Sequence, residues 1–478
     1  MTHAVAQSSN LSKSVAASPF WTLDRVAEAL ASIAVTPLPR GSTGLSAVNT
    51  DTRTVAAGNL FVALRGDRFD AHAFLADAVG KGASALVVSD AAPAASLGVP
   101  AYVVTDTTAA LGLLGRYRRR AWAKTVVAVA GSNGKTSTKE LTSAALGSRL
   151  SVYPTRGNLN NHIGVPLTLL AIPDDADVAV VEIGTNHPGE VATLRALVEP
   201  DVAILTSIGE EHLEGLGDLA GVLREESAVF IDVPVAIVPA GQPEIGEAAR
   251  GLAKSVVSAG LASGDMRPDS WAITPDGAGT LRFGDIEVKP PLRGEHNLRN
   301  AMLAIATARA LGISVDDAAS GIARTPALPM RSAWVSIGSF TVINDAYNAN
   351  PASARESLKM LAGVDTSRQR VAVLGSMLEL GPAGPGLHDE IARLALAGPA
   401  MIIAGIGEFA RALNAAAPND ARVLTAPDVP ELWARLSPTL APDAMILLKG
   451  SRGTRLERLI PLLEAHAGVH PASASDQH

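Results

Sequence analysis

The stretch Gly131-Ser-Asn-Gly-Lys-Thr-Ser-Thr-Lys139 follows the apolar run Thr125–Ala130 and opens a helical segment. A strand, a glycine-rich turn that ends in Gly-Lys-Thr, and a helix are the layout of a phosphate-binding loop, whose backbone N–H groups face an anion. The full pattern has a glycine five residues before Gly134, where this chain has Val129, so the loop is a shortened variant. A plain strand-to-helix turn is the weaker alternative. We therefore predict a nucleoside triphosphate site formed by Gly131, Ser132, Asn133, Gly134, Lys135, Thr136 and Ser137, with Lys135 on the outer phosphates and the Thr136 hydroxyl on Mg²⁺.

The composition excludes several kinds of partner. Of the 478 residues, 47% are apolar and 18% are charged, and the net charge is −7. Such a chain can bury the cores of roughly two to four domains and has no basic surface for nucleic acid. The chain has no cysteine, which fits a reducing cytoplasm, and no apolar run reaches the roughly 18 residues of a membrane span. We expect a cytoplasmic monomer with a polar, disordered start at residues 1–18.

Alternating apolar runs and helical segments divide the chain into three α/β regions. We predict a first domain at residues 19–123, a central domain with a buried parallel sheet at 124–328, and a smaller doubly wound domain at 329–478. Two prolines within 325–329 mark a hinge. The expected strands are Leu60–Leu64, Ala85–Val88, Ala101–Val104, Thr125–Ala130, Val178–Ile183, Val202–Ser207, Val235–Val238, Arg370–Gly375, Met401–Ala404 and Ala444–Lys449, with a hairpin at Trp271–Val288. The expected helices are Leu23–Ala31, Ala71–Lys81, Thr108–Ala123, Asn297–Leu311, Ile391–Ala397, Phe409–Ala416 and Thr454–Ala465.

Two polar residues follow central strands where open α/β sheets bind ligands. Glu182 ends the run Val178–Glu182, so it can hold Mg²⁺ beside Thr136; a solvated carboxylate is the alternative. His212 comes after the next strand, in Ser207-Ile-Gly-Glu-Glu-His-Leu-Glu-Gly215. A lone histidine is more often structural, but its place beside the phosphate loop favours metal ligation.

Other polar residues are weak signals when each is taken alone. Asn158, Asn160 and Asn161 lie in a loop fenced by glycine and proline, where an ordinary turn is the alternative. His296, Asn297 and Asn300 open an alanine-rich helix, where asparagine is usually a cap. Further along the chain, Arg331 follows the hinge, and Asp345-Ala-Tyr-Asn-Ala-Asn-Pro351 joins a strand to a helix.

Together, in this order and spacing, these stretches resemble the Mur ligase family, the ATP-dependent amide-bond-forming enzymes of peptidoglycan assembly. The resemblance covers the chain from about Trp21 to the last predicted helix. The stretches that carry it are Asp51-Thr-Arg53, Asn59-Leu-Phe-Val-Ala-Leu-Arg-Gly66, Phe69-Asp-Ala-His72, Gly157-Asn-Leu-Asn-Asn-His-Ile-Gly-Val-Pro166, Glu182-Ile-Gly-Thr-Asn-His-Pro-Gly-Glu190, His212-Leu-Glu-Gly-Leu-Gly217, Asp345-Ala-Tyr-Asn-Ala-Asn-Pro351 and Leu448-Lys-Gly-Ser-Arg452.

The resemblance implies three domains and a reaction in two steps. ATP phosphorylates the terminal carboxylate of a UDP-N-acetylmuramoyl-tripeptide, and the amine of D-alanyl-D-alanine then attacks the acyl phosphate. Phosphoryl transfer between anions needs positioning and charge neutralisation. The implied cofactors are ATP and Mg²⁺, and the implied partners are these small molecules, with no nucleic acid and no membrane insertion.

The resemblance also implies a role for individual residues. The catalytic residues would be Lys135, Glu182, His212, Arg331 and Asn158, and the metal ligands Thr136, Glu182, His212 and Glu226. Nucleotide contacts beyond the phosphate loop would come from His296, Asn297, Asn300, Arg331 and Asp345. Contacts to the peptide substrates and UDP would come from Asp51, Thr52, Arg53, Asn158, Asn160, Asn161, Thr185, His187, Tyr347, Asn348 and Asn350.

Three alternatives remain open at this point. A sister ligase that adds another amino acid and a folylpolyglutamate-type synthase share the same layout, although Tyr347-Asn-Ala-Asn-Pro351 and Asn158-Leu-Asn-Asn161 favour the dipeptide-adding member. A nucleotide-switch binding module is an alternative of a different class. No Asp-x-x-Gly follows a strand near the phosphate loop, which disfavours the switch.

Two positions depart from the family pattern. Ser376 stands where relatives often have aspartate, so we assign it no role. Fourteen residues after His212, the family has a lysine that becomes carbamylated and holds a second Mg²⁺, and here that position is Glu226. Glutamate also presents anionic oxygens to a hard cation, but its reach is shorter by roughly 3–4 Å. We predict that Glu226 acts through a water or on a shifted metal while Glu225 faces elsewhere; a solvated helix residue is the alternative.

Overall fold

The structure, a computed structural model, describes residues 19–66, 69–364 and 367–469. The chain forms two compact units, the first ending at Ala121 and the second beginning at Trp122. The predicted disordered start at residues 1–18 lies outside the described residues. None of the helices in the described ranges is long and apolar enough to cross a bilayer.

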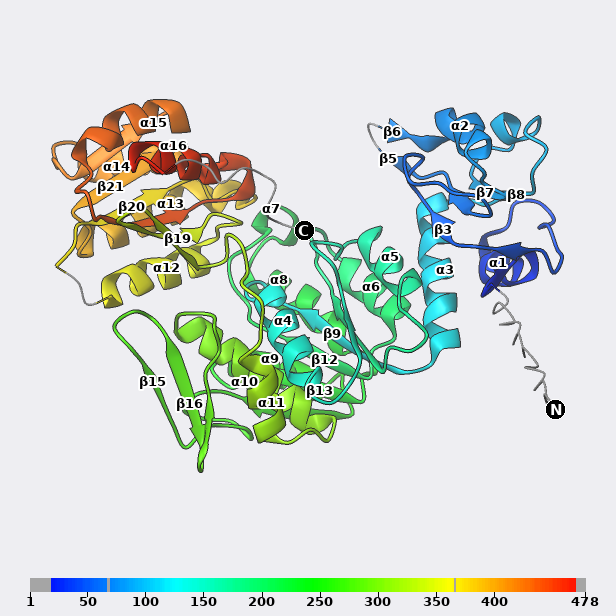
Figure 1. The fold of residues 1–478 in the computed structure, drawn as a ribbon, viewed down its shortest axis with the longest axis horizontal. Coiled ribbons are helices and arrows are strands. Elements are labelled where there is room, and N and C mark those ends of the chain that lie inside the picture. Colours follow the sequence, from blue (N-terminus) through cyan, green and yellow to red (C-terminus); the bar gives the residue numbers. More distant parts are fainter. Residues whose placement is uncertain (1–18, 67–68, 365–366, 470–478) are drawn as a thin grey trace, which may run out of the picture. The chain divides into compact units, whose positions relative to one another are not determined.

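The first unit contains a four-stranded parallel sheet in the order β3-β4-β7-β8. Its inner strands are continuous apolar runs that are buried along their whole length, as expected for a parallel sheet covered on both faces. The predicted helix Ala71–Lys81 is broken, because Asp70 caps only a short 3-10 turn and Phe74 leaves helical geometry. The elements are β1 (Trp21–Thr22), α1 (Leu23–Leu30), β2 (Gly44–Leu45), β3 (Val48–Asn49), β4 (Leu60–Val62), β5 (Arg65–Gly66), β6 (Phe69–Asp70), α2 (Leu75–Gly80), β7 (Ala85–Val88), β8 (Ala101–Val103) and α3 (Thr107–Trp122) (Figure 1).

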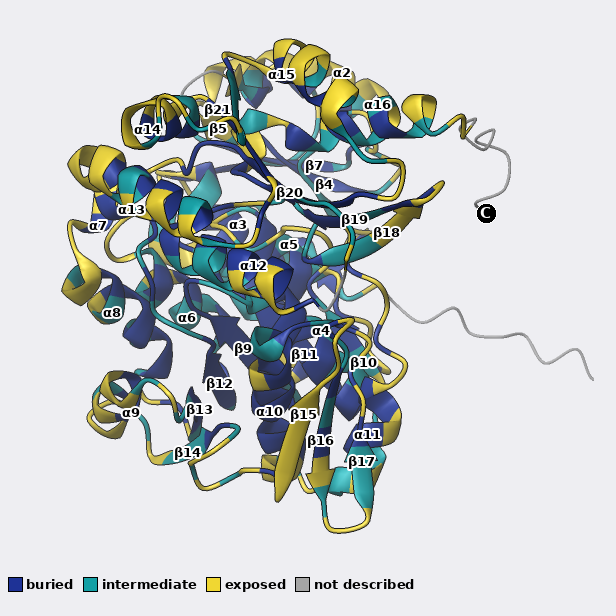
Figure 2. Cartoon of the chain, turned by 90° about the vertical axis from the view of Figure 1, so that its left-hand side faces the viewer, coloured by how far each residue is buried: buried dark blue, intermediate teal, exposed yellow. Residues whose placement is uncertain are grey.

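The second unit begins with a six-stranded parallel sheet in the order β10-β11-β9-β12-β13-β14. Successive residues of β9 face opposite sides, so Val127 and Val129 join one apolar core while Val126 and Ala128 join the other. Central strands are buried, whereas the separate strand β15 is exposed (Figure 2). The elements are β9 (Thr125–Ala130), α4 (Lys135–Leu146), β10 (Val152–Pro154), α5 (Gly164–Leu170), β11 (Val178–Glu182), α6 (Glu190–Val198), β12 (Val202–Leu205), α7 (Leu213–Leu216), α8 (Leu219–Ser227), β13 (Val235–Pro239), α9 (Pro243–Arg250), β14 (Ser255–Ala259), β15 (Ser270–Ile273), β16 (Gly279–Phe283), β17 (Ile286–Val288), α10 (Glu295–Ala310) and α11 (Val315–Ile322).

Three expectations for this part of the chain were wrong in detail. The predicted strand Val202–Ser207 stops at Leu205, because the next two hydroxyls turn to bind the phosphate loop. Trp271–Val288 forms a three-stranded antiparallel sheet rather than a hairpin, since it contains two reversing turns. The strands β10 and β14 were missed: β10 has only three residues, and β14 is an edge strand with a serine at two of its five positions.

The second unit continues with a second six-stranded sheet in the order β18-β19-β23-β20-β21-β22, parallel except for β18. The smaller doubly wound domain is therefore confirmed, although the exact domain boundaries stay predictions. The helix expected from Ile391 begins at Gly384, because proline is compatible with a first helical turn. The last helix begins late, after Arg455 adopts φ +55°. The elements are β18 (Ala333–Ile337), β19 (Phe340–Asp345), α12 (Pro351–Gly363), β20 (Arg370–Leu374), α13 (Gly384–Ala397), β21 (Ile402–Ile406), α14 (Glu408–Ala416), β22 (Val423–Ala426), α15 (Val429–Leu436), β23 (Met445–Lys449) and α16 (Leu459–His466).

A buried histidine makes the stability of this last sheet sensitive to acid. His388 is 1% exposed; its Nε2 accepts from the Met377 N–H and its Nδ1 contacts the Gly384 carbonyl. Burial lowers the pKa of His388. Because the folded state prefers the neutral ring, this contribution is complete above the unfolded pKa of about 6.5 and is lost as the pH falls below it.

We expect the unfolding free energy of the wild-type chain to fall more steeply between pH 6.5 and 5 than that of His388→Gln. The difference in slope is at most one proton, about 1.4 kcal/mol per pH unit. Urea denaturation at several pH values measures it. His466→Gln, an exposed histidine of the same domain, is the control and should keep the wild-type slope. Equal slopes for the wild type and His388→Gln would contradict this prediction.

Candidate active site

A cavity of about 1060 Å³ lies in the second unit, at the carboxyl ends of β9, β11 and β12 and against α12 and β19. Most of the residues predicted from the sequence line it, although they come from segments more than 200 residues apart. They are Ser132, Asn133, Gly134, Lys135, Thr136, Ser137, Asn160, Asn161, Glu182, Thr185, His187, His212, His296, Asn297, Asn300, Arg331, Asp345, Tyr347, Asn348 and Asn350. Gly131, Asn158 and Glu226 are not among the lining residues.

The phosphate loop is held in a conformation that only glycine tolerates at two positions. Gly131 has φ +120° and Gly134 has φ +85°. A Cβ on Gly131 would meet the Thr206 Oγ1 at 2.4 Å and the Thr206 N at 2.8 Å. The hydroxyls of Thr206 and Ser207 donate to the Asn133 carbonyl at 2.6 and 3.2 Å. The two residues that follow β12 therefore set the loop geometry.

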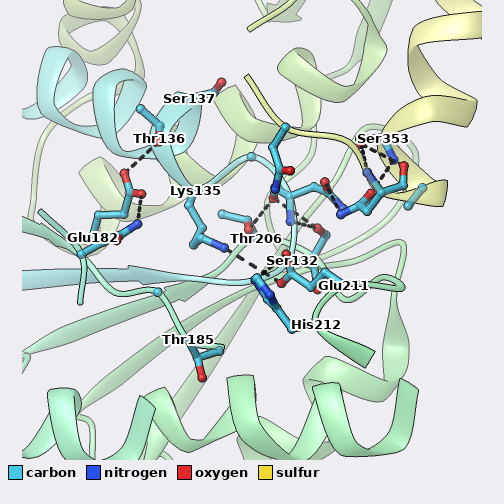
Figure 3. Close-up of a pocket in the computed structure, with 18 of the residues that line it drawn as sticks. Ser132, Lys135, Thr136, Ser137, Glu182, Thr185, Thr206, Glu211, His212 and Ser353 are labelled. Atoms are coloured by element: carbon cyan, nitrogen blue, oxygen red, sulfur yellow. Dashed lines mark hydrogen bonds and ion pairs between the residues drawn. The ribbon is translucent and has the colours of Figure 1, made fainter. Parts of the chain in front are cut away.

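Lys135 lies among carboxylates at the start of α4 (Figure 3). Its Nζ donates to the Gly131 carbonyl and lies 4.0 Å from the Glu211 Oε1. Burial by itself lowers the pKa of Lys135, but Glu211, Glu226 and Glu182 outweigh it and raise the pKa above its usual value. The ammonium group therefore stays charged, as a phosphate clamp requires.

Glu182 connects the phosphate loop to the asparagine loop. Its Oε2 accepts from the Thr136 hydroxyl and its Oε1 from the Asn160 side-chain amide, both at 2.9 Å. The side chain is 2% exposed, yet it lines the cavity. The alternative of a solvated strand-end carboxylate is therefore wrong. Hydroxyl and carboxylate oxygens placed side by side are ligands that suit Mg²⁺.

Glu226 is buried completely, so the alternative of a solvated helix residue is wrong. Its Oε2 accepts from the Gly131 N–H at 2.8 Å, while its Oε1 has no hydrogen-bond partner among the described residues. Burial raises the pKa of Glu226 against the opposing effect of Lys135. Glu225, as predicted, faces elsewhere: it accepts from the N–H groups of Gly189 and Val191.

Glu211 was missed by the sequence reasoning, which considered only its neighbour His212. The Glu211 side chain is 5% exposed and lines the cavity, and its Oε1, like that of Glu226, has no hydrogen-bond partner among the described residues. Burial raises the pKa of Glu211 to about 8, with Lys135 opposing and Glu226 reinforcing the shift. A second glutamate directly before the histidine was a usable signal, because both residues follow a strand end.

His212 lies beside the same carboxylates. Its Nδ1 is 2.5 Å from the Glu379 Oε2 of the third domain, and its Nε2 is 3.8 Å from the Glu211 Oε2. Burial and then Lys135 lower the pKa of His212, with Glu379 opposing. Within the described ranges no three His, Asp or Glu side chains gather closely enough to hold a metal by themselves. The four predicted metal ligands are thus not assembled into one preformed cage.

Residues of the third domain complete the cavity. The Asn350 amide, which caps α12, donates to the Asn133 Oδ1 at 2.9 Å. Asp345 accepts from the Ser332 N–H at 2.8 Å and from the Lys449 ammonium at 2.6 Å. The sequence reasoning assigned no role to Lys449, although it lies in a stretch that carries the resemblance.

Arg331 follows Met330 and precedes Ser332, both of which have positive φ. Its guanidinium lies 3.9 Å from the centre of the Tyr347 ring, a cation–π distance. Stacking holds the arginine at the cavity wall, where it is available to an anionic ligand.

The polar residues at the start of α10 are not helix caps, so that alternative is wrong. The N-cap is Gly294, which makes no side-chain cap. The Asn297 amide donates to the Arg293 carbonyl at 2.8 Å, and the Asn300 amide donates to the Asn297 Oδ1 at 3.1 Å. Burial lowers the pKa of His296, with Asp345 opposing. These side chains thus form a connected polar wall.

The asparagine loop and the loop before α6 divide into functional and structural parts. Asn158 is exposed and outside the cavity lining, so the geometry gives no support to its predicted catalytic role. The Asn161 Oδ1 accepts from the N–H groups of Ile163 and Gly164, where α5 begins. Thr185 donates to the His187 carbonyl at 3.0 Å, so its hydroxyl already has a partner within the loop.

The residues predicted to hold UDP lie in the first unit. The Asp51 carboxylate pairs with the Arg53 guanidinium at 2.6 Å, and this side-chain hydrogen bond lowers the pKa of Asp51 to about 2. Thr52 accepts from the Lys81 ammonium through its carbonyl at 3.1 Å. Elsewhere, Ser376 accepts from the Glu408 N–H at 2.9 Å and so joins β20 to α14.

Comparison with known proteins covers nearly the whole chain. Family models match three segments: "Mur ligase family, catalytic domain" at residues 45–119, "Mur ligase middle domain" at 129–308, and "Mur ligase, glutamate ligase domain" at 330–452. The chain is 35% identical to the UDP-N-acetylmuramoyl-tripeptide–D-alanyl-D-alanine ligase of Escherichia coli, covering 88% of this chain and 94% of that one. It is 31% identical to the ligase of the same name from Bacillus subtilis, covering 87% and 93%. A crystal structure of MurF from Acinetobacter baumannii, 32% identical, superposes with a TM-score of 0.84 over 93% of this chain and 99% of that one.

The phosphate loop yields a direct test of its geometry. We expect Gly131→Ala to lower the unfolding free energy by about 2–4 kcal/mol, because the added Cβ meets backbone atoms in a strained conformation. Gly157→Ala is the control: Gly157 has φ +57° and open space around it, so only the strain of about 1 kcal/mol applies. Denaturant unfolding measures both, and equal losses would contradict the steric role of β12.

Proposed function

The chain belongs to the Mur ligase family, and from that premise we propose that it uses ATP to join D-alanyl-D-alanine to a UDP-N-acetylmuramoyl-tripeptide. This step belongs to the synthesis of peptidoglycan precursors. The observation that carries the proposal is the cavity in which a charged Lys135, Glu182 and the third-domain residues Arg331 and Asp345 face one another. A cytoplasmic location and a monomeric state remain predictions.

The arrangement suits transfer of a phosphoryl group between two anions. Lys135 would clamp the outer phosphates, since its pKa stays high in spite of burial. Arg331 would contribute a second positive charge from across the cavity. Neutralising the charge that builds on the transferred group lowers the barrier, and a dry, preorganised site strengthens that effect.

Mg²⁺ fits the oxygen ligands that line this part of the cavity. We propose that the Thr136 hydroxyl and Glu182 hold it, with His212 and the free Oε1 of Glu226 nearby; the ion would supply charge neutralisation on the phosphates. Because Mg²⁺ keeps waters and takes phosphate oxygens as ligands, a preformed cage of three protein side chains is not required.

The third domain would exclude water once both substrates are bound. An acyl phosphate is open to hydrolysis, so its carbonyl carbon must be kept from water until the amine arrives. The bond from Asn350 to the phosphate loop and the stacked Arg331 show third-domain groups at the cavity wall. We propose that His296, Asn297, Asn300 and Asp345 contact the adenosine part of ATP.

The alternatives are less well supported. A sister ligase or a folylpolyglutamate-type synthase shares the fold, but the relatives at 31–35% identity are named for the addition of the dipeptide. A nucleotide-switch module would not need two further domains around its loop. An assay that compares amine substrates distinguishes these alternatives.

We expect phosphate release from ATP in the presence of UDP-N-acetylmuramoyl-tripeptide and D-alanyl-D-alanine, and far less with D-alanine or other amines. Lys135→Ala should lower the rate by about 10²–10³ or more, since it removes the phosphate clamp, while binding of the UDP substrate stays nearly intact. A coupled phosphate assay and calorimetry measure these quantities. Near-normal turnover of Lys135→Ala would refute the phosphate-loop assignment, and equal rates with D-alanine would favour a sister ligase.

We expect activity that is insensitive to bicarbonate, because Glu226 stands where the resemblance places a carbamylated lysine. Glu226→Ala should raise the Mg²⁺ concentration needed for half-maximal rate, since one anionic oxygen beside the phosphate loop is lost. The exposed Glu247→Ala on α9 is the control and should leave the Mg²⁺ titration unchanged. Restoration of activity by bicarbonate after removal of CO₂ would argue against this role, as would an unchanged Mg²⁺ dependence in Glu226→Ala.

A further inference from the structure

Two consecutive glutamates at the end of α8 point to opposite loops of the active site. Successive residues of an α-helix are about 100° apart around its axis, so Glu225 and Glu226 diverge. Glu226 accepts from the Gly131 N–H at 2.8 Å. Glu225 accepts from Gly189 N–H at 2.6 Å and from Val191 N–H at 2.8 Å.

The two partner loops form different walls of the cavity. Gly131 begins the phosphate loop, whose residues Ser132 to Ser137 line the cavity. Residues 185–190 line it as well and lead into α6. Figure 3 places Thr185, whose hydroxyl oxygen lies 3.2 Å from the Glu225 Oε1, on the side of the cavity away from the phosphate loop.

Neither glutamate lines the cavity itself. Glu225 is 7% exposed and Glu226 is wholly buried, so Glu225 acts on a loop and does not itself contact a ligand. Glu226 keeps one oxygen without a hydrogen-bond partner in the described part of the chain, but both oxygens of Glu225 are bonded to the loop before α6. Glu225 therefore uses both of its carboxylate oxygens to hold that loop.

The helix that carries the pair is fixed at its other end. Asp218 caps α8 by accepting from the Gly221 N–H at 2.8 Å. Val222, which is fully buried, packs in the apolar cluster that includes Met377 and Leu380 of the third domain. α8 thus contacts the phosphate loop, the loop before α6 and the third domain.

We propose that Glu225 is a positioning residue for the peptide substrate and that, together with Glu226, it fixes the spacing between the phosphate loop and residues 185–190. This inference rests on the proposed function, in which the phosphate donor binds one wall and the tripeptide carboxylate the other. Because in-line transfer requires the reacting atoms within about 3–3.5 Å, a shift of either wall separates the two substrates.

A carboxylate is required at position 225 for a simple reason. It accepts two N–H groups through its two oxygens, and charge-assisted hydrogen bonds are roughly twice as strong as neutral ones. In Glu225→Gln only one oxygen remains, and the new NH₂ group would face an N–H donor. The substitution keeps the volume of the side chain while it removes one bond to the loop.

The test compares two isosteric variants against two ligands. Calorimetry measures binding of UDP-N-acetylmuramoyl-tripeptide without nucleotide, and of ADP without the tripeptide. We expect Glu225→Gln to lower the affinity for the tripeptide substrate about tenfold, equivalent to about 1.4 kcal/mol. The affinity of this variant for ADP should stay within twofold of the wild-type value. Glu226→Gln should weaken ADP and leave the tripeptide within twofold. Glu247→Gln on α9 is the control and should change neither.

Several outcomes would overturn the inference. If each variant lowers the affinity for both ligands equally, the two glutamates act only on global stability. If Glu225→Gln binds the tripeptide substrate as tightly as the wild type does, Glu225 does not position that substrate. Should Glu225→Gln not fold, hydrogen exchange in the wild type decides: fast exchange at Gly189 and Val191 would overturn the inference, and slow exchange that slows further with the tripeptide but not with ADP would support it. Failure of the wild type to bind the tripeptide would refute the proposed function instead.

Discussion

One lysine buried among three glutamates is the constraint on which this site depends. Glu182, Glu211 and Glu226 come from three different segments, and together they hold the pKa of Lys135 above its usual value against the lowering effect of burial. The reverse also holds, because Lys135 opposes the burial that raises the pKa of both Glu211 and Glu226. Such a cluster is costly in an apolar interior, so its place at the end of the central sheet indicates selection for anion chemistry rather than for stability.

The surrounding fold supplies what that cluster needs. Strand β9 brings the glycine loop to the sheet edge, the segment that follows β12 orients it through the Thr206 and Ser207 hydroxyls, and the N-cap of α12 reaches it through Asn350. None of these contacts is local in sequence. Because these contacts are hydrogen bonds within the protein, they hold the loop in its shape before any ligand binds. Such preorganisation is the condition for effective electrostatic stabilisation of a transition state.

The order of the elements and most cavity residues could be predicted from the sequence, because continuous apolar strands and a glycine loop are strong local signals. Strand Thr125–Ala130 agrees with β9 at both ends. What could not be predicted depends on tertiary contacts: the early end of β12, the burial of Glu226, and the roles of Glu211 and Lys449 follow from neighbours far along the chain. Asn158 shows the opposite limit, since a family motif drew attention to a side chain that is not among the residues lining the cavity, and its role stays a prediction.

Glu226, which stands where the resemblance leads us to expect a lysine, joins α8 to the phosphate loop. A side chain shorter than a carbamylated lysine reaches less far, and here one of its oxygens is held by the Gly131 N–H. The other oxygen has no hydrogen-bond partner among the described residues. The same contact ties the end of α8 to the phosphate loop. It is this tie that leaves Glu225, one residue earlier, directed at the loop before α6.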